Sequence, residues 1–190
     1  MSRIPDGEAD LLLACDAVVG VADNSLKTLS KNKSQAIINI DVDPVGVVGF
    51  GNGTTVPEKV IFSRLEKFLD SKKFSTYNIQ QICESLMGNK VTANVMMLGI
   101  ALQKGMIPIS VASVEKALTL NGASVQDNLI ALKWGRWLAY DKQYVLEASG
   151  YNKISSINNG LENAGIGELL DAFSEKLILY QDANYAKHYR

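Results

Sequence analysis

Short apolar runs separated by polar turns fill the first half of the chain, a pattern that predicts strands alternating with helices. The segment "AIINI" at 36–40 is unbroken, apolar and partly β-branched, as in a strand covered on both faces. The segment "DAVVGV" at 16–21 predicts an earlier strand, after a short apolar helix or strand at 8–15. Between the strands, Asp23 or Asn24 can cap a helix in "DNSLKTLSK". Strand, helix, strand indicates a βαβ unit and a parallel or mixed sheet.

After residue 57 the apolar positions follow mainly helical spacing. Val60, Leu65 and Phe68 share one face of a predicted helix whose other face is charged. The segment "FSTYNI" at 74–79 predicts one more short strand, followed by a helix that carries Ile82 and Leu86.

Two further helices are bounded by clear stop and start signals. Apolar residues recur at helical spacing from residue 91 to 102, and Gly105 followed by Pro108 ends that helix. Ser110 begins the next helix, which ends at Asn121-Gly122. We expect the two helices to form a hairpin laid on the sheet.

The segment "NGASVQDNLIALKWGR" at 121–136 predicts a helix stop and a new helix start. Ser124, followed three residues later by Asp127, resembles a capping box. The new helix is apolar on two faces, and burying two tryptophans removes roughly 150–250 Å² each from water, so we expect it to be sandwiched between other elements. A glycine costs about 1 kcal/mol in a helix relative to alanine, so Gly135 indicates close approach of another backbone. Arg136 is expected in a surface or interface ion pair. The two predicted apolar stripes are Val125, Leu129 and Leu132, and Ile130, Trp134 and Trp137.

Composition excludes several classes of protein. The formal net charge of -1 gives no field that would attract nucleic acid or an anionic membrane, and no apolar run approaches the roughly 20 residues of a membrane span. The start "MSRIPDGEAD" contains no apolar signal region, and the cysteines number only two. We therefore expect a cytoplasmic protein with no nucleic-acid or membrane partner.

Candidate cofactor sites are weak. The glycine-rich loop at 49–53 has the spacing of neither a dinucleotide fingerprint nor a Walker loop, so we interpret it as a turn. Two cysteines and one histidine cannot supply the roughly four ligands of a structural zinc or an iron–sulfur cluster, so any cluster must belong to a partner. The sequence predicts no metal site and no catalytic residue.

The reactive side chains also have ordinary interpretations. His188 is interpreted as a solvated histidine near the end of the sequence. Cys15 and Cys83 lack neighbouring Lys, Arg or His residues and are expected in the core, as are Met96 and Met97.

Three segments together resemble a known family. They are "DLLLACDAVVGVADNSLKTLS", "TANVMMLGIALQKGMIPISVASVEKALTLNGASVQDNLIALKWGR" and "LILYQDANYAKHYR". In combination they resemble the indolepyruvate ferredoxin oxidoreductase family, and specifically the gamma-type domain of the 2-oxoacid:ferredoxin oxidoreductases. The matching positions are Asn94, Gly99, Gly105, Pro108, Asn121, Gly122, Asn128, Trp134, Gly135 and Arg136.

The resemblance implies an oxidoreductase that acts on an oxo group with an iron–sulfur protein as acceptor. Such an enzyme oxidatively decarboxylates an aryl pyruvate, transfers the acyl group to coenzyme A and passes electrons to ferredoxin. Thiamine diphosphate and iron–sulfur clusters are held by other domains or subunits, which are the expected partners. This chain is then a supporting part, inactive alone, and Asn94, Asn121 and Asn128 are candidates for the surface that faces the partners or the acyl acceptor.

The resemblance also sets the expected architecture. We expect an α/β, Rossmann-like fold, with a three-layer arrangement of a sheet and helices on both faces, and a C-terminal helical extension. Residues 1–146 are the expected gamma-type domain, lacking the first βα unit that opens the family domain, and residues 147–190 a linker and helical segment. The missing unit suggests a fragment or a split gene product.

Two other hypotheses belong to different classes. One is a non-catalytic scaffold or assembly remnant, and the other is a free-standing Rossmann-like nucleotide binder.

Overall fold

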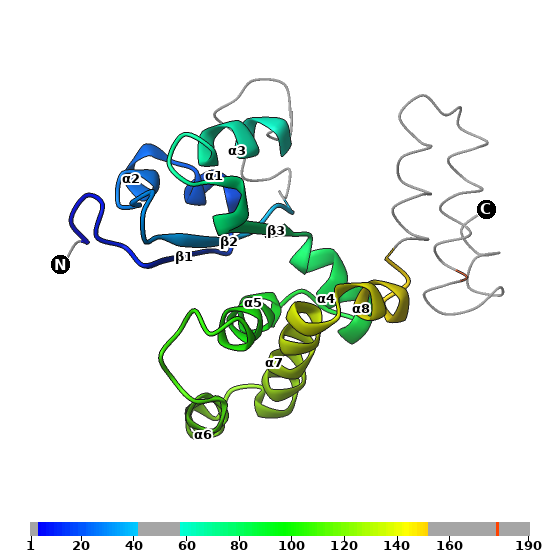
Figure 1. Ribbon diagram of the computed structural model, residues 1–190. Coiled ribbons are helices and arrows are strands. Elements are labelled where there is room, and N and C mark those ends of the chain that lie inside the picture. Colours follow the sequence, from blue (N-terminus) through cyan, green and yellow to red (C-terminus); the bar gives the residue numbers. More distant parts are fainter. Residues whose placement is uncertain (1–3, 42–57, 152–177, 179–190) are drawn as a thin grey trace, which may run out of the picture. The chain divides into compact units, whose positions relative to one another are not determined.

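The computed structural model describes residues 4–41, 58–151 and 178 (Figure 1). The chain divides into two compact units, Met1–Val145 and Leu146–Arg190, and the first unit contains almost all of the described residues. Within the described ranges, no helix combines the length and the apolar character needed to cross a membrane. The predicted loop at 49–53, the linker and helical extension beyond residue 151, and His188 lie outside the described residues.

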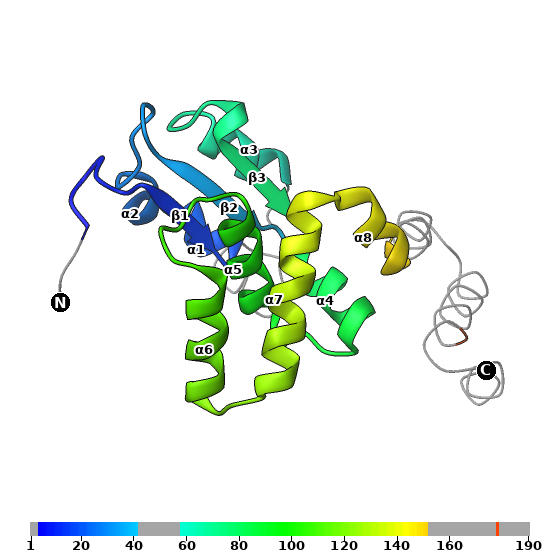
Figure 2. The same ribbon diagram turned by 60° about the horizontal axis from the view of Figure 1, so that its bottom comes forward.

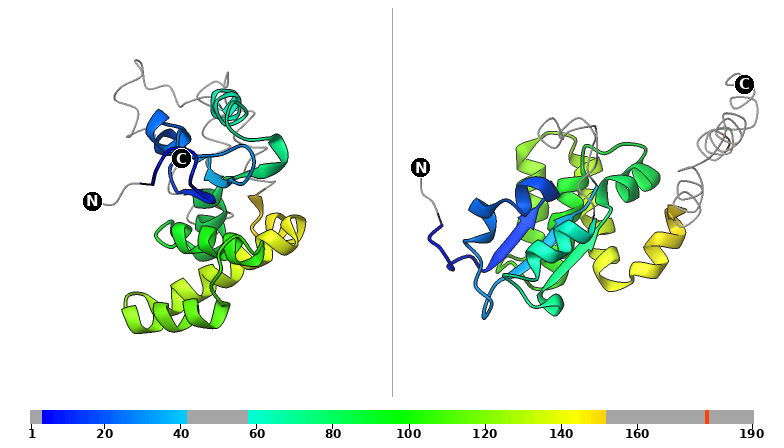
Figure 3. Two further views of the ribbon diagram at one scale, coloured as in Figure 1. Left: turned by 60° about the vertical axis from the view of Figure 1, so that its left-hand side comes forward. Right: turned by 90° about the horizontal axis from the view of Figure 1, so that it is seen from above.

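A parallel three-stranded sheet forms the centre of the first unit. Strands β1 (Leu11–Ala14), β2 (Gln35–Asn39) and β3 (Phe74–Tyr77) lie side by side in that order (Figures 1 and 3). The apolar run predicted at 36–40 is β2, in which every residue after the first is buried, because strands flank it on both sides and helices cover both faces. The fold is α/β and Rossmann-like, as the sequence predicts.

Three helices cover one face of this sheet (Figures 1 and 2). They are α1 (Ala17–Gly20), α2 (Asp23–Leu26) and α3 (Glu58–Leu65). Leu26, Ile61 and Leu65 are fully buried in the core between these helices and the strands. The core on this face therefore comes from the connections between consecutive parallel strands, as in a βαβ arrangement.

The strand predicted at 16–21 is wrong. The strand lies earlier, at Leu11–Ala14, and Asp16 ends the extended segment because its Oδ1 accepts the backbone N–H groups of Val18 (2.7 Å) and Val19 (3.2 Å). This cap starts α1 within an apolar run that also suits a strand. The predicted Asp23 or Asn24 cap of the next helix is wrong as well: α2 has Ala22 at its N-cap, with no side-chain hydrogen bond, and Asp23 pairs with Arg64.

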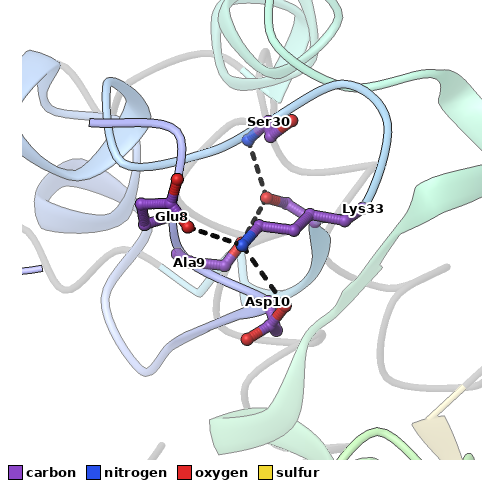
Figure 4. A network of polar contacts seen from close by, with 6 residues as sticks. Glu8, Ala9, Asp10, Ser30 and Lys33 are labelled. Atoms are coloured by element: carbon purple, nitrogen blue, oxygen red, sulfur yellow. Dashed lines mark hydrogen bonds and ion pairs between the residues drawn. The ribbon is translucent and has the colours of Figure 1, made fainter. Parts of the chain in front are cut away.

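The amino-terminal edge of the sheet is fastened by a polar network (Figure 4). Lys33 Nζ lies 3.0 Å from Glu8 Oε2 and 3.7 Å from Asp10 Oδ1. The hydrogen bond to Glu8 raises the pKa of the Lys33 ammonium, although exposed pairs of this kind stabilise a fold little. Beneath it, the buried Ser34 hydroxyl donates to the Ala9 carbonyl and accepts the Ser30 N–H at 2.7 Å. The loop before β2 is thereby held to the segment before β1.

Helices of the second half cover the opposite face of the sheet (Figures 1 and 2). A short 3₁₀ turn, η2 (Ser71–Lys73), precedes β3, and the strand leads into α4 (Ile79–Met87). Helix α5 (Ala93–Gln103) follows and contacts β1 and β2. It is apolar on almost every side, and Met96, Met97 and Ile100 are at most 1% exposed, which confirms the methionines as core residues.

The main partner of α5 is α7, so the predicted hairpin of α5 with α6 is wrong. Helix α6 (Val111–Asn121) begins and ends where predicted, with Ser110 Oγ accepting the Ser113 N–H and Gly122 in the left-handed conformation. It packs on α7 (Val125–Tyr140) and buries only Val114. The spacing of consecutive helices favoured a hairpin, but the backbone contact at Gly99 and Gly135 pairs α5 with α7 instead.

Two glycines bring α5 and α7 into backbone contact. A Cβ added at Gly135 would lie 3.1 Å from Gly99 Cα and 2.8 Å from the Met96 carbonyl carbon, and closer still to the Met96 oxygen. A Cβ at Gly99 would likewise meet the backbone of α7, at 3.1 Å from Arg136 N. The close approach predicted from Gly135 is confirmed.

The predicted surroundings of α7 are wrong in two respects. The helix is not sandwiched, because Trp137 is 49% exposed and Ile130 is 44% exposed. Ser124 forms no capping box; it has a positive φ of 43° and makes no side-chain cap hydrogen bond. The buried residues of α7 are Ala131, Leu132, Gly135 and Leu138, of which only Leu132 belongs to a predicted stripe. The last helix, α8 (Lys142–Ala148), begins directly after α7.

Candidate functional site

The carboxyl ends of the parallel strands are the first place to look for a site, because ligands of open α/β sheets bind outside this edge. The side chain of Asn39, at the end of β2, is 1% exposed and ties the strand ends together. Its Nδ2 donates to the carbonyl of Cys15 (3.0 Å), just after β1, and its Oδ1 accepts the N–H groups of Asp41 (3.2 Å) and Ile79 (3.1 Å). One amide thus links the segments that follow all three strands.

Asp41 joins the same edge to the start of α4. Its Oδ2 accepts the backbone N–H groups of Gln80 (2.6 Å) and Gln81 (3.2 Å), while its buried Oδ1 has no hydrogen-bond partner among the described residues. Burial raises the pKa of the Asp41 carboxyl above its ordinary value of 3.8, against the lowering effect of the two N–H donors. One oxygen of the carboxyl therefore caps α4, while the other is buried without a hydrogen bond to any described residue.

The hydrogen bonds of Asn39 and Asp41 make this edge a structural network. In the described part of the chain, no three residues among His, Cys, Asp and Glu gather as a metal site. Neither Asn39 nor Asp41 was predicted from the sequence as part of a site. The available signal was a polar residue closing an apolar run, "AIIN", two positions before an aspartate that can reach the next helix.

The two cysteines have different environments. Cys83 is buried in α4 with its sulfur 3.5 Å from Thr92 Oγ1, as a core residue is expected to be. Cys15 is exposed, so its predicted core position is wrong, because the strand ends one residue earlier and the chain turns into α1. Burial, partial for Cys15 and complete for Cys83, raises the pKa of both thiols, which disfavours the reactive thiolate.

The three candidate asparagines lie on separate elements. Asn94 is exposed in the first turn of α5, where its Oδ1 is 2.9 Å from the Val95 N–H. Asn121 is exposed at the end of α6, and Asn128 in α7 donates from Nδ2 to the Ala123 carbonyl at 2.9 Å. No hydrogen bond within the described ranges joins Asn94 to either of the others. Asn128 therefore fastens the α6–α7 turn, while Asn94 and Asn121 present their side chains at the surface.

Arg136 binds a neutral group where an ion pair was expected. Its Nε donates to Gln103 Oε1 at 3.0 Å, from α7 to the last residue of α5. This bond crosses the same pair of helices that Gly99 and Gly135 bring together. The matching positions of the resemblance thus include a physical unit, the α5–α7 contact.

Comparison with known families decides the wider relationship. The family model described as pyruvate ferredoxin/flavodoxin oxidoreductase matches residues 1–137, nearly three quarters of the chain. The chain belongs to this family. As a pyruvate ferredoxin/flavodoxin oxidoreductase family member it is a component of a 2-oxoacid:ferredoxin oxidoreductase, and the match runs through the whole sheet and most of α7. No curated protein and no solved structure matches the chain.

Enzymes of this family use thiamine diphosphate, iron–sulfur clusters and coenzyme A. The described residues do not fit a cluster: the sequence has two cysteines, one of which is buried in α4 and the other exposed after β1. Nor do they bring together a carboxylate set for the metal ion of a diphosphate. The chemistry of these groups is therefore not assigned to the described residues.

Proposed function

We propose that this chain is the gamma-type component of a 2-oxoacid:ferredoxin oxidoreductase whose substrate is an aryl pyruvate such as indolepyruvate. The observation that carries the proposal is the family match over residues 1–137. The three sequence segments that resemble the indolepyruvate enzymes support the narrower assignment. Two of them form β1 with α1 and α2, and the α5–α7 unit.

In this proposal the chain supports catalysis performed by partner domains. The partners hold thiamine diphosphate and the iron–sulfur clusters, oxidise the 2-oxoacid with loss of carbon dioxide, transfer the acyl group to coenzyme A and reduce ferredoxin. The small number of potential cluster ligands in the sequence supports this division of labour. Residues 1–146 form the gamma-type domain and residues 147–190 the following segment, within a cytoplasmic enzyme.

The exposed asparagines have a place in the proposal. Asn94 and Asn121 face partner domains or the acyl acceptor, since both present unburied amides on helix termini. Asn128 holds the turn between α6 and α7 that carries Asn121, so it is a positioning residue for this surface.

Co-purification with the other subunits tests the proposal. The tagged chain, expressed together with the thiamine-binding and cluster-binding subunits of its source, should form a stable complex. That complex should reduce ferredoxin with indolepyruvate faster than with pyruvate or 2-oxoglutarate. A stable complex that prefers pyruvate would refute the aryl assignment and leave the component role intact, while failure of the chain to join any such complex would refute the component role.

A further inference from the structure

Helix α7 presents an exposed aromatic strip on the side away from its buried face. Lys133, Arg136, Trp137 and Tyr140 follow one another at the spacing that places residues on one helical face. The Trp137 ring lies 5.9 Å from the Tyr140 ring and 5.5 Å from the ring of Tyr144 in α8. Trp137 is 49% exposed, Tyr140 76% and Tyr144 51%. Three clustered and exposed aromatic side chains are an unusual feature for a surface without a binding function.

Positive charge surrounds this strip. Lys133 and Arg136, with Gln103, Trp137 and Tyr140, line an open hollow of about 410 Å³. Lys104 follows Gln103 in the chain, and Lys142 begins α8, the helix that carries Tyr144. We call these eight residues the Trp137 surface: Gln103, Lys104, Lys133, Arg136, Trp137, Tyr140, Lys142 and Tyr144.

The cations of the Trp137 surface have no acidic partners within the described ranges. Lys104 and Lys142 both lie over the ring of Tyr77, with Nζ 5.7 Å and 5.3 Å from its centroid, and Lys104 also donates to Ser75 Oγ at 2.8 Å. Among the ion pairs of the described residues, none involves Lys104, Lys133, Arg136 or Lys142. The nearest carboxylate in sequence, that of Asp141, accepts the Tyr144 N–H at 3.0 Å and caps α8.

Three lysines near the amino-terminal edge of the sheet are paired with carboxylates. Lys27 lies 4.0 Å from Asp6, Lys31 lies 3.9 Å from Asp70, and Lys33 contacts both Glu8 and Asp10. The chain therefore balances charge locally near the amino-terminal edge of the sheet and leaves it unbalanced around Trp137. An external anionic surface would supply the missing charge.

The shape of the Trp137 surface favours a protein over a small molecule. Small-ligand pockets enclose roughly 70–90% of a typical ligand, whereas this hollow is open and its aromatic rings are about half exposed or more. Tryptophan, tyrosine and arginine at the centre of a patch with charged residues around it are typical of protein interfaces.

We propose that the Trp137 surface binds an acidic surface of a partner subunit, with Trp137 as the central anchor and the four cations facing carboxylates of that subunit. This inference rests on the proposed function, because the partner is a subunit of the same oxidoreductase. It adds to that function which face of the chain makes the contact and what chemistry the opposing face has.

Titration calorimetry of the full chain against its purified thiamine- and cluster-binding subunits tests the inference. Trp137→Ala should weaken binding by at least about tenfold, since it removes the anchor. The double variant Lys133→Glu/Arg136→Glu should weaken it by a similar factor, and raising the salt concentration should weaken wild-type binding more than binding of the double variant. Lys59→Glu reverses one charge at an exposed residue of α3, on the opposite face of the sheet; it is the control and should bind as the wild type does.

The outcomes separate the two claims. Wild-type binding that is unchanged by both surface variants would overturn the inference and leave the component role standing, whereas no binding by the wild type would overturn both. Binding that depends on Trp137 but not on salt or on the two charges would refute the acidic partner surface. Analytical sedimentation of the chain alone tests whether a second copy of the chain binds the Trp137 surface. A dimer that Trp137→Ala dissociates would overturn the inference. Circular dichroism of every variant should match the wild type, because the changed side chains are wholly or partly exposed.

Discussion

Replacing Gly135 by alanine tests the packing of α5 against α7. The added Cβ would lie 2.8 Å from the Met96 carbonyl carbon and 3.1 Å from Gly99 Cα, where ordinary contact begins near 3.4 Å. Both neighbours are backbone atoms, so no side chain can rotate away and the two helices must move apart. Their separation would disturb Met96, Ile100 and Leu132, which are fully buried.

The free energy of unfolding should fall despite a favourable change in helix propensity. Overpacking of this kind costs about 3 kcal/mol, and alanine regains about 1 kcal/mol over glycine, which leaves a net loss of about 2 kcal/mol. For a chain of this length the loss corresponds to a decrease in Tm of roughly 4–8 °C. Urea unfolding and calorimetry on the full chain measure both quantities.

A matched pair of variants isolates the propensity term. Lys133 is exposed on the same helix, so Lys133→Gly should be less stable than Lys133→Ala by about 1 kcal/mol. If Gly135→Ala is as stable as the wild type, or more stable, while the Lys133 pair behaves normally, the reasoning about backbone contact is refuted.

Three further predictions concern caps and the sheet edge. Burial raises the folded-state pKa of Asp41 above its ordinary value of 3.8, so the favourable contribution of this carboxyl to the free energy of unfolding is complete below pH 3.8 and is lost as the pH rises through the raised folded pKa. Asp41→Asn should lose this pH dependence when urea unfolding is measured from about pH 3 upwards. Identical pH profiles for the variant and the wild type would contradict the prediction. Asn39→Ala should destabilise the fold by about 1–3 kcal/mol, since it leaves the buried Ile79 N–H without its acceptor, and a near-neutral effect would show that water replaces the amide. Ser110→Ala should cost about 1 kcal/mol by removing the cap of α6, and chemical denaturation that detects no loss would count against the Ser113 hydrogen bond.

Elements with a single physical interpretation could be predicted from the sequence. The run at 36–40 suits a buried strand, and Ser110 and Gly122 mark the ends of α6 because a hydroxyl and a left-handed glycine suit those positions. Gly135 also had a single physical interpretation. A glycine between two tryptophans in a strong helix needs a compensating contact, and the Met96 and Gly99 backbones provide it.

Elements whose outcome depends on tertiary structure could not be predicted. Residues 16–21 suit a strand or a helix, and the hydrogen bonds of Asp16 decide between them. Large side chains suggested that α7 was buried through its tryptophans, but the glycine contact turns Ala131 and Leu138 inward and leaves Trp137 at the surface. Size alone does not fix the buried face of a helix when small residues allow closer packing.

The sheet-edge network was hidden for a related reason. Asn39 and Asp41 are at or just after the end of a strand, yet their partners Cys15, Ile79 and Gln80 lie 24 to 40 positions away. Only the parallel order of the strands brings these segments together. The exposed asparagines came from family resemblance, and their roles stay predictions.

Reconstitution of the enzyme with and without this chain tests whether the chain is a working component of the oxidoreductase. The measurement is ferredoxin reduction driven by indolepyruvate and coenzyme A, with acyl-coenzyme A quantified in parallel. We predict full activity only when the chain joins the thiamine- and cluster-binding subunits, and none from the chain alone. Activity of the isolated chain, or undiminished activity of the other subunits without it, would contradict this role.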